Sequence, residues 1–163
     1  MPSIDIVIPC YNHGDFLPDS VGSVLSQEIG DLRILIVDNA STDGSADVAR
    51  QLAASDARIE LLLRNTNQGP HASFNAGIDW AKSDYFLILC ADDILAPGCL
   101  ARAIHALEQE REASFAFGGQ LIWEAGTPCP MLAVTNDAAS RTAVSAEKFI
   151  PIFSLPHQPV GTG

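Results

Sequence analysis

Several short runs of mostly apolar residues, separated by segments of helical length, constrain the fold more than any other feature of this sequence. In the first intervening segment, Leu17, Val21 and Val24 recur at the spacing of one helical face. Strands that alternate with helices form βαβ crossovers, and strands that are apolar on both faces are typical of a buried parallel sheet. We therefore predict an α/β fold with a mostly parallel sheet and helices on both faces. The predicted strands are SIDIVIPC (3–10), RILIVD (33–38), IELLL (59–63), YFLILC (85–90) and SFAFGGQLIWE (114–124).

Proline and small polar residues mark where the intervening helices begin. Pro18, Pro70 and Pro97 are each predicted to lie at the start of a helix, where the missing amide hydrogen costs nothing. The segment STDGS (41–45) is interpreted as a set of helix caps with a tight turn at its glycine. Gly77 is interpreted as a residue that serves helix packing.

The bulk composition narrows the classes of protein to which this chain can belong. A length of 163 residues with 47% hydrophobic and 18% charged residues predicts one globular domain rather than a disordered chain. The formal net charge of −11 argues against nucleic-acid binding, and it disfavours an anionic ligand unless a metal ion accompanies it. The N-terminus has no signal-peptide pattern and no apolar run is long enough to span a membrane, so we expect a cytoplasmic protein with reduced cysteines.

Polar and aromatic residues follow three of the predicted strands directly. Pro9 and Tyr11 end the first strand, Asp38 ends the second, and Asp92 and Asp93 follow the fourth. Ligands of open parallel sheets bind beyond the carboxyl ends of the strands. Two adjacent carboxylates repel each other unless a cation neutralises them, and Mg²⁺ or Mn²⁺ prefers oxygen ligands. This pattern indicates a site for a divalent cation and a diphosphate ligand.

Four segments in this order resemble the motifs of nucleotide-sugar glycosyltransferases of family 2, which have the Rossmann-like GT-A fold. The resemblance extends from Ile4 to about Ala103 and is weak beyond. It implies transfer of a sugar from a nucleotide-diphosphate donor to an acceptor hydroxyl, with inversion and with a divalent cation, Mg²⁺ or Mn²⁺, as cofactor. The acceptor, a saccharide or a lipid, is not indicated. The segments are IVIPCYN, ILIVDNASTDGS, NQGPHASFNAGI and YFLILCADDIL.

The resemblance also implies a role for each candidate site residue. Pro9 and Tyr11 stand where the family packs the nucleotide base, and Asp38 matches the acid that hydrogen-bonds this base. Asp92 matches the position that faces the ribose, and Asp93 matches the metal ligand of the family's D-x-D variant.

The sequence departs from the family at two positions, and two other functions stay open. Cys90 stands where many members have an acid, and Phe74 stands where the family often has a basic residue. A receiver-like module that binds Mg²⁺ without catalysis is one alternative, although its acid pair would follow the first strand, where Cys10 and Tyr11 stand here. A nucleotidyltransferase of related fold is the other, although it would need a glycine-rich basic loop at the same place.

The resemblance divides the chain into two parts. Residues 1–123 are expected to form the nucleotide-sugar-binding α/β core, and residues 124–163 an incomplete, truncated acceptor-side segment with a short helix near 145–150. Because Glu124, Asp137 and Glu147 do not form the acidic pair that supplies the family's base, no catalytic residue is assigned. The chain is expected to bind a donor and to transfer sugar poorly or not at all.

Overall fold

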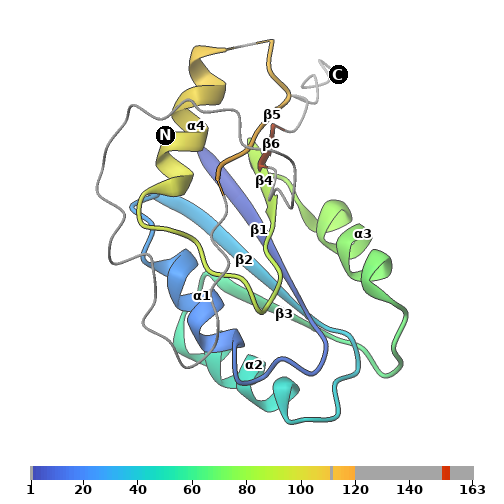
Figure 1. Ribbon diagram of the computed structural model, residues 1–163. Coiled ribbons are helices and arrows are strands. Elements are labelled where there is room, and N and C mark those ends of the chain that lie inside the picture. Colours follow the sequence, from blue (N-terminus) through green and yellow to red (C-terminus); the bar gives the residue numbers. More distant parts are fainter. Residues whose placement is uncertain (1, 111, 120–151, 155–163) are drawn as a thin grey trace, which may run out of the picture.

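A single twisted sheet forms the centre of the protein, as seen in a computed structural model that describes residues 2–110, 112–119 and the backbone of 152–154 (Figure 1). The strand order is β3-β2-β1-β4-β6-β5. The first four strands in this order are parallel, and β6 runs antiparallel to both of its neighbours, so the predicted mostly parallel sheet is confirmed. The strands are β1 (Ser3–Cys10), β2 (Asp31–Asp38), β3 (Ile59–Leu63), β4 (Tyr85–Ile88), β5 (Phe115–Ala116) and β6 (Ile152–Ser154).

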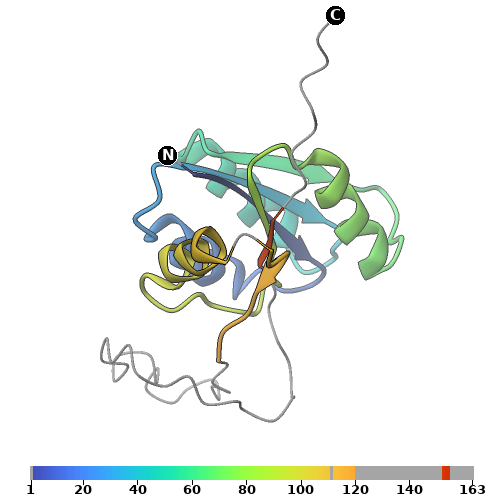
Figure 2. The same ribbon diagram turned by 90° about the horizontal axis from the view of Figure 1, so that it is seen from above.

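The last strands differ most from the prediction. Only Phe115–Ala116 of the predicted strand 114–124 forms β5, and residues 120–124 lie outside the described part of the chain, as does the helix predicted near 145–150. β6 was not predicted, yet it lies between β4 and β5 and pairs with both (Figure 2). β4 ends at Ile88, but the amide of Leu89 still donates to the carbonyl of Val7 (3.0 Å).

The helices cover both faces of the sheet, as predicted. α1, α2 and α4 pack on one face and α3 on the other (Figure 1). Proline lies in the first turn of α1 and of α3, as predicted. The prediction that Pro97 starts a helix is wrong, because Gly98 has a left-handed conformation (φ +67°) and α4 begins only after it, two residues beyond Pro97. No helix among the described residues is long and apolar enough to cross a membrane. The helices are α1 (Leu17–Leu25), α2 (Ser45–Ser55), α3 (Pro70–Trp80) and α4 (Cys99–Gln109).

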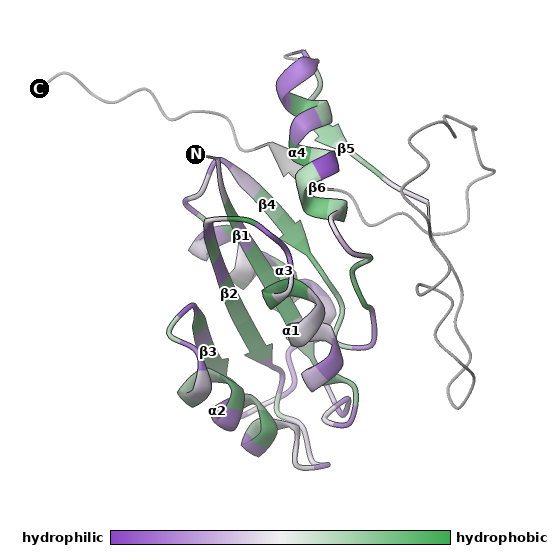
Figure 3. Cartoon of the chain, turned by 90° about the vertical axis from the view of Figure 1, so that its left-hand side faces the viewer, coloured by the Kyte–Doolittle hydropathy of each residue, from purple (hydrophilic) through white to green (hydrophobic). Residues whose placement is uncertain are grey.

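β1 is the central strand, and both of its faces bury apolar side chains. Ile4, Ile6 and Ile8 pack with the α1 side and Val7 with the α3 side, and all four are fully buried. Figure 3 shows the resulting hydrophobic strands among helices with hydrophilic outer faces. Gly77 of α3 lies so close that a Cβ atom there would meet Val7 Cγ1 at 2.5 Å, which confirms its role in helix packing.

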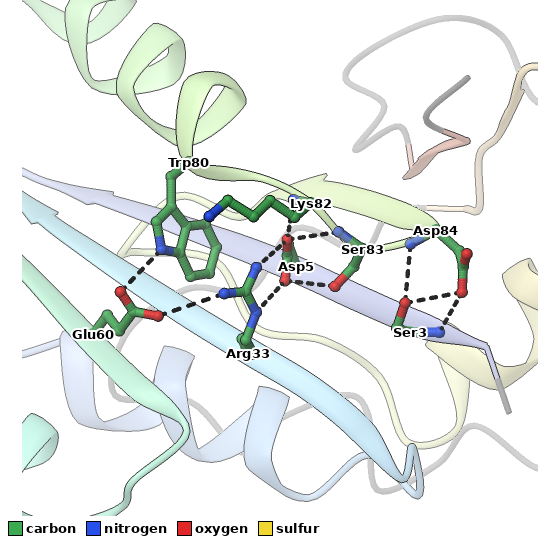
Figure 4. A network of polar contacts seen from close by, with 8 residues as sticks. All are labelled: Ser3, Asp5, Arg33, Glu60, Trp80, Lys82, Ser83 and Asp84. Carbon is green, nitrogen blue, oxygen red and sulfur yellow. Dashed lines mark hydrogen bonds and ion pairs between the residues drawn. The ribbon is translucent and has the colours of Figure 1, made fainter. Parts of the chain in front are cut away.

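A buried aspartate ties the beginning of β1 to its neighbours (Figure 4). Asp5 is fully buried and accepts two hydrogen bonds from Arg33, Nε at 2.9 Å and Nη2 at 2.7 Å. It also accepts the amides of Lys82 and Ser83 and the Ser83 hydroxyl, at 2.6, 2.9 and 2.7 Å. The Arg33 guanidinium in turn lies 4.5 Å from the centre of the Trp80 ring. This network joins β1, β2 and the α3–β4 connection, at the opposite end of β1 from the candidate site.

Candidate functional site

The acidic segments that follow β2 and β4 are both fastened to the end of β1. The amide of Asn39 donates to the carbonyl of Cys10 (2.9 Å), and the amide of Ala91 donates to the carbonyl of Pro9 (3.3 Å). Because β2 and β4 are the two neighbours of β1, the predicted site residues lie at one edge of the sheet. The structure therefore gathers them as the strand order requires.

The acid pair after β4 lies in a tight turn. The carbonyl of Cys90 accepts the amide of Asp93 (3.0 Å) and the hydroxyl of Ser20 in α1 (3.3 Å). One ligand atom each from Cys90, Asp92 and Asp93 lies within 4.8 Å of the others. Asp92 is exposed and the other two are half-buried, so solvent reaches the cluster. Two carboxylates and a sulfur atom in this arrangement could hold a divalent cation, since carboxylate oxygens suit Mg²⁺ and Mn²⁺.

Ser23 in α1 and Gln27, two residues beyond the end of this helix, hold the loop that continues from the acid pair. The Ser23 hydroxyl accepts the amide of Leu95 (3.0 Å). The Gln27 side chain, which is 4% exposed, donates to the carbonyl of Ala96 (3.1 Å) and accepts the amide of Leu100 (3.3 Å). Sequence reasoning missed these residues because it examined only the apolar face of the helix. Helical spacing could have placed Ser23 on the polar side of α1, but it gives no signal for Gln27, which lies beyond the end of the helix at Leu25.

Asp38 is buried at the end of β2 with one of its oxygens unpaired. The residue is 2% exposed. Its Oδ2 accepts the amide of Ser41 (3.1 Å), whereas Oδ1 has no hydrogen-bond partner among the described residues. A buried carboxylate oxygen without a donor costs free energy, so this atom needs an explanation other than folding.

The loop after β1 carries Tyr11 and is tied to the loop after β2. Tyr11 is 45% exposed, and Pro9 is half-buried within β1. Asn12, in the left-handed region (φ +58°), donates its amide to Ser41 Oγ (3.0 Å) and accepts the amide of Thr42 through its side chain (2.8 Å). The two loops therefore form one connected surface beside Asp38.

The capping interpretation of STDGS is only partly right. The residue that caps α2 is Gly44 (φ +92°), which confirms the tight turn but not a capping side chain. Asp43 accepts instead the amides of Ser45 (3.0 Å) and Gly14 (3.2 Å). Hydrogen bonds from Ser45 lower the pKa of the Asp43 carboxyl. Asp43 thus joins the start of α2 to the β1–α1 loop.

The β3–α3 loop completes this edge of the sheet. The Asn39 side chain donates to Asn67 (2.9 Å) and accepts the amide of Gln68 (3.0 Å). Arg64, which sequence reasoning did not single out, donates to Gln68 and to the carbonyl of Ala72 (2.9 Å). A basic side chain therefore lies beside the start of α3, although Phe74 replaces the basic residue expected within the helix.

The cysteines are thiols rather than disulfides where they are described. Cys10 is 2% exposed, and burial raises the pKa of its thiol. Cys99 packs against the core and its thiol pKa is likewise raised by burial. Cys129 lies outside the described residues.

Comparison with known proteins identifies the family. The chain matches "Glycosyl transferase family 2" over residues 5–122. It is 32% identical to the Bacillus subtilis "Putative teichuronic acid biosynthesis glycosyltransferase TuaG", over 78% of this chain and 50% of that protein. It is also 32% identical to the Campylobacter jejuni "GalNAc(5)-diNAcBac-PP-undecaprenol beta-1,3-glucosyltransferase", over 77% of this chain and 40% of that protein. The chain thus spans half or less of the length of these relatives.

Solved structures share the fold at lower identity. The mannosyltransferase PcManGT of Pyrobaculum calidifontis, in complex with GDP-Man and Mn²⁺, has a TM-score of 0.61 at 23% identity, covering 65% of this chain and 32% of that one. TarS 1-349 of S. aureus, in complex with UDP-GlcNAc, has a TM-score of 0.60 at 18% identity, covering 69% and 33%. The fold is therefore that of GT-A transferases, and the family match favours a glycosyltransferase over the receiver-like and nucleotidyltransferase alternatives. By its match over residues 5–122, this chain belongs to glycosyl transferase family 2.

Proposed function

We propose that the described residues bind a nucleotide-diphospho-sugar together with a divalent cation, as the donor side of an inverting glycosyl transfer. The observation that carries this proposal is the pair of features on either side of the end of β1. On one side is the buried Oδ1 of Asp38, which has no partner in the described part of the chain, and on the other is the cluster of Cys90, Asp92 and Asp93. Two strand spacings separate β2 from β4, on the order of 10 Å, a span that one nucleoside can bridge.

In this proposal the nucleoside lies across the end of β1. The exposed ring of Tyr11 offers a stacking surface for the base, beside Pro9. The unpaired oxygen of Asp38 would accept a hydrogen bond from the base, which would remove the cost of leaving it unsatisfied. Asp92, exposed next to the turn, would accept a hydroxyl of the ribose.

Asp93 would hold the cation, with Asp92 and Cys90 beside it. A divalent cation, when bound, supplies Lewis-acid neutralisation of the leaving diphosphate. The net charge of −11 supports a requirement for the cation, because the chain would otherwise repel a diphosphate. Mn²⁺ accompanies GDP-Man in the mannosyltransferase of similar fold, which supports a divalent cation together with the donor here.

The acceptor is proposed from the relatives alone. The names of two relatives refer to teichuronic acid biosynthesis and to an undecaprenol-linked saccharide. We therefore propose a saccharide hydroxyl as acceptor, either free or lipid-linked. Glu124 and Asp137, the two acids that could serve as base, lie outside the described residues, so the base stays unassigned.

Calorimetric titration of nucleoside diphosphates tests the donor site. UDP, GDP and TDP are titrated into the wild type, Asp93→Asn and Asp31→Asn, each with and without Mn²⁺. Asp31 is an exposed acid at the far end of β2, so its variant loses the same charge away from the site. With Mn²⁺, Asp93→Asn should bind about tenfold to a hundredfold more weakly, since a hydrogen bond or contact to a charged group contributes about 1.5–3 kcal/mol. Equal affinities for wild type and Asp93→Asn would remove the metal role of Asp93.

A further inference from the structure

The turn after β4 offers sulfur as well as oxygen atoms as possible metal ligands. Sγ of Cys90 and one carboxylate oxygen each of Asp92 and Asp93 lie within 4.8 Å of one another. Mg²⁺ sites are built from oxygen ligands, whereas thiolate favours Zn²⁺ and other softer cations. A cysteine in this place is therefore chemically different from the carboxylate or carbonyl that a site selective for Mg²⁺ would use.

The backbone keeps the Cys90 side chain next to the two acids. Its carbonyl accepts both the amide of Asp93 and the hydroxyl of Ser20, a residue that is fully buried in α1. The position of Cys90 relative to Asp93 is therefore set by a closed turn anchored on a helix. The other described cysteines do not lie beside an acid pair in this way, because Cys10 is buried in the core and Cys99 packs against the core.

The present separations suit one shared cation after small side-chain rotations. Metal–sulfur and metal–oxygen bonds of about 2.3 and 2.1 Å place sulfur and oxygen roughly 3.6 Å apart around a tetrahedral ion. The ligand atoms of the cluster are within 4.8 Å of one another, and Cys90 and Asp93 keep contact with solvent. Rotation about the side-chain bonds of Asp92 and Asp93 can close the difference without moving the turn.

We infer that Cys90 is a ligand of this cation site and shifts its preference from Mg²⁺ toward softer divalent cations such as Co²⁺, Zn²⁺ and Cd²⁺. Coordination replaces the S–H bond by a sulfur–metal bond and releases the thiol proton to solvent. The inference rests on the proposed function for the location of the cation, and it adds the identity of a ligand and the class of metal that the ligand selects.

Cobalt absorption reads out the sulfur ligand directly. Co²⁺ is titrated, with and without UDP or GDP, into the wild type, Cys90→Ser and Cys99→Ser, the last being a matched loss of a thiol outside the cluster. A near-ultraviolet sulfur-to-cobalt charge-transfer band is expected in the wild type and in Cys99→Ser, and its absence is expected in Cys90→Ser. The affinity for Cd²⁺ should fall at least about tenfold to a hundredfold in Cys90→Ser, the loss seen when even a residue that supports a metal ligand is replaced. The affinity for Mg²⁺ should not fall.

A second measurement does not depend on the folding of any variant. In the wild type, Cd²⁺ should protect Cys90 from alkylation, as read by mass spectrometry, and should leave the alkylation of Cys99 unchanged.

A further variant tests the metal preference itself. Cys90→Asp should reverse this preference, binding Mg²⁺ more tightly and Cd²⁺ more weakly than the wild type. Absence of the charge-transfer band in the wild type at saturating Co²⁺, or equal protection of both cysteines, overturns the inference.

The two proposals fail in distinguishable ways. If nucleoside diphosphates bind with Mn²⁺ but no sulfur band forms with Co²⁺, the donor site stands and Cys90 is not a ligand. If the band forms and depends on Cys90 but neither UDP nor GDP binds with any cation, the sulfur ligand stands and the donor function falls.

Discussion

Replacing Asp5 with Asn should destabilise the protein more than any surface charge substitution. The Asp5 carboxylate accepts five hydrogen bonds from Arg33, Lys82 and Ser83 and has no exposed surface. An asparagine has nearly the same shape, but it carries an NH₂ group in place of one acceptor and has no charge. Donors that now point at one carboxylate oxygen would then meet another donor.

The magnitude follows from the chemistry of the lost pair. Breaking a buried ion pair by removing one partner costs about 3–5 kcal/mol. The lower end applies here because the side chain of Arg33 is 34% exposed and keeps a contact with Glu60 (Nη1 to Oε1, 3.6 Å). At about 3 kcal/mol, the melting temperature of a chain of this length should fall by roughly 6–12 °C.

Urea and thermal unfolding, followed by circular dichroism at pH 7, measure this loss. Asp47→Asn is the matched control, because Asp47 also pairs with an arginine, Arg50, at 2.6 Å, but on an exposed surface. Exposed ion pairs contribute little, so the control should unfold almost as the wild type does. If Asp5→Asn were no less stable than Asp47→Asn, the network would not hold the sheet together as argued.

The pH dependence has a definite sign. Burial by itself would raise the pKa of Asp5, but hydrogen bonds from Arg33, Lys82 and Ser83 outweigh it and hold the pKa below its ordinary value of 3.8. The unfolded chain therefore takes up the proton first as the pH falls, and the stabilisation from Asp5 is lost as the pH drops through 3.8 toward the lower folded value. The stability difference between wild type and Asp5→Asn should be complete near neutral pH and should shrink in this acidic range. A difference that grows on acidification would contradict the assigned shift.

Three further substitutions test the packing and the site. Asp38→Ala should reduce the discrimination between UDP, GDP and TDP in calorimetry while leaving the requirement for Mn²⁺ intact, and an unchanged preference order would make Asp38 a turn residue. Gly77→Ala should cost about 1–3 kcal/mol in urea unfolding, because its Cβ would overlap Val7, and a Val7→Ala background should reduce this cost. Gln27→Ala should cost about 1–3 kcal/mol, because the buried amide of Leu100 would lose its partner, and it should also weaken Mn²⁺-dependent diphosphate binding; wild-type values of both would refute its anchoring role.

The parallel part of the sheet could be predicted from the sequence because its signal is local. Each of the first four strands contains a short apolar run. β1, β2 and β4 are largely buried on both faces, which leaves such a run no polar side, whereas β3 at the edge of the sheet is partly exposed. β6 could not be predicted in this way, since Ile152–Ser154 is only three residues long and lies in a short segment between Pro151 and Pro156. Its place in the sheet is determined by pairing with β4 and β5, which are distant in sequence.

The position of the candidate site was also predictable, but not the residues that support it. Strand order alone brings the ends of β1, β2 and β4 together, so Asp38, Asp92 and Asp93 gather at one edge. The anchoring role of Gln27 depends on which loop crosses α1, and apolar periodicity carries no information about that loop. The observed start of α4 differs from the predicted start at Pro97 for a similar reason. Gly98 has a left-handed backbone conformation, which the residue pattern did not predict.

Two buried aspartates in the same sheet show how polar groups are divided between folding and binding. Asp5 has every acceptor position engaged by a donor of the protein, and removing it should therefore reduce folding stability. Asp38 is almost equally buried, but one of its oxygens has no donor among the residues that the structure describes. Unsatisfied buried groups are costly, so each one calls for an explanation such as a role in binding. The end of β2 therefore carries a stability cost that the beginning of β1 does not, and a ligand that donates a hydrogen bond to Asp38 would recover it. On this argument, ligand binding should stabilise the fold through Asp38, and Asp5 should contribute the same stability with or without the ligand.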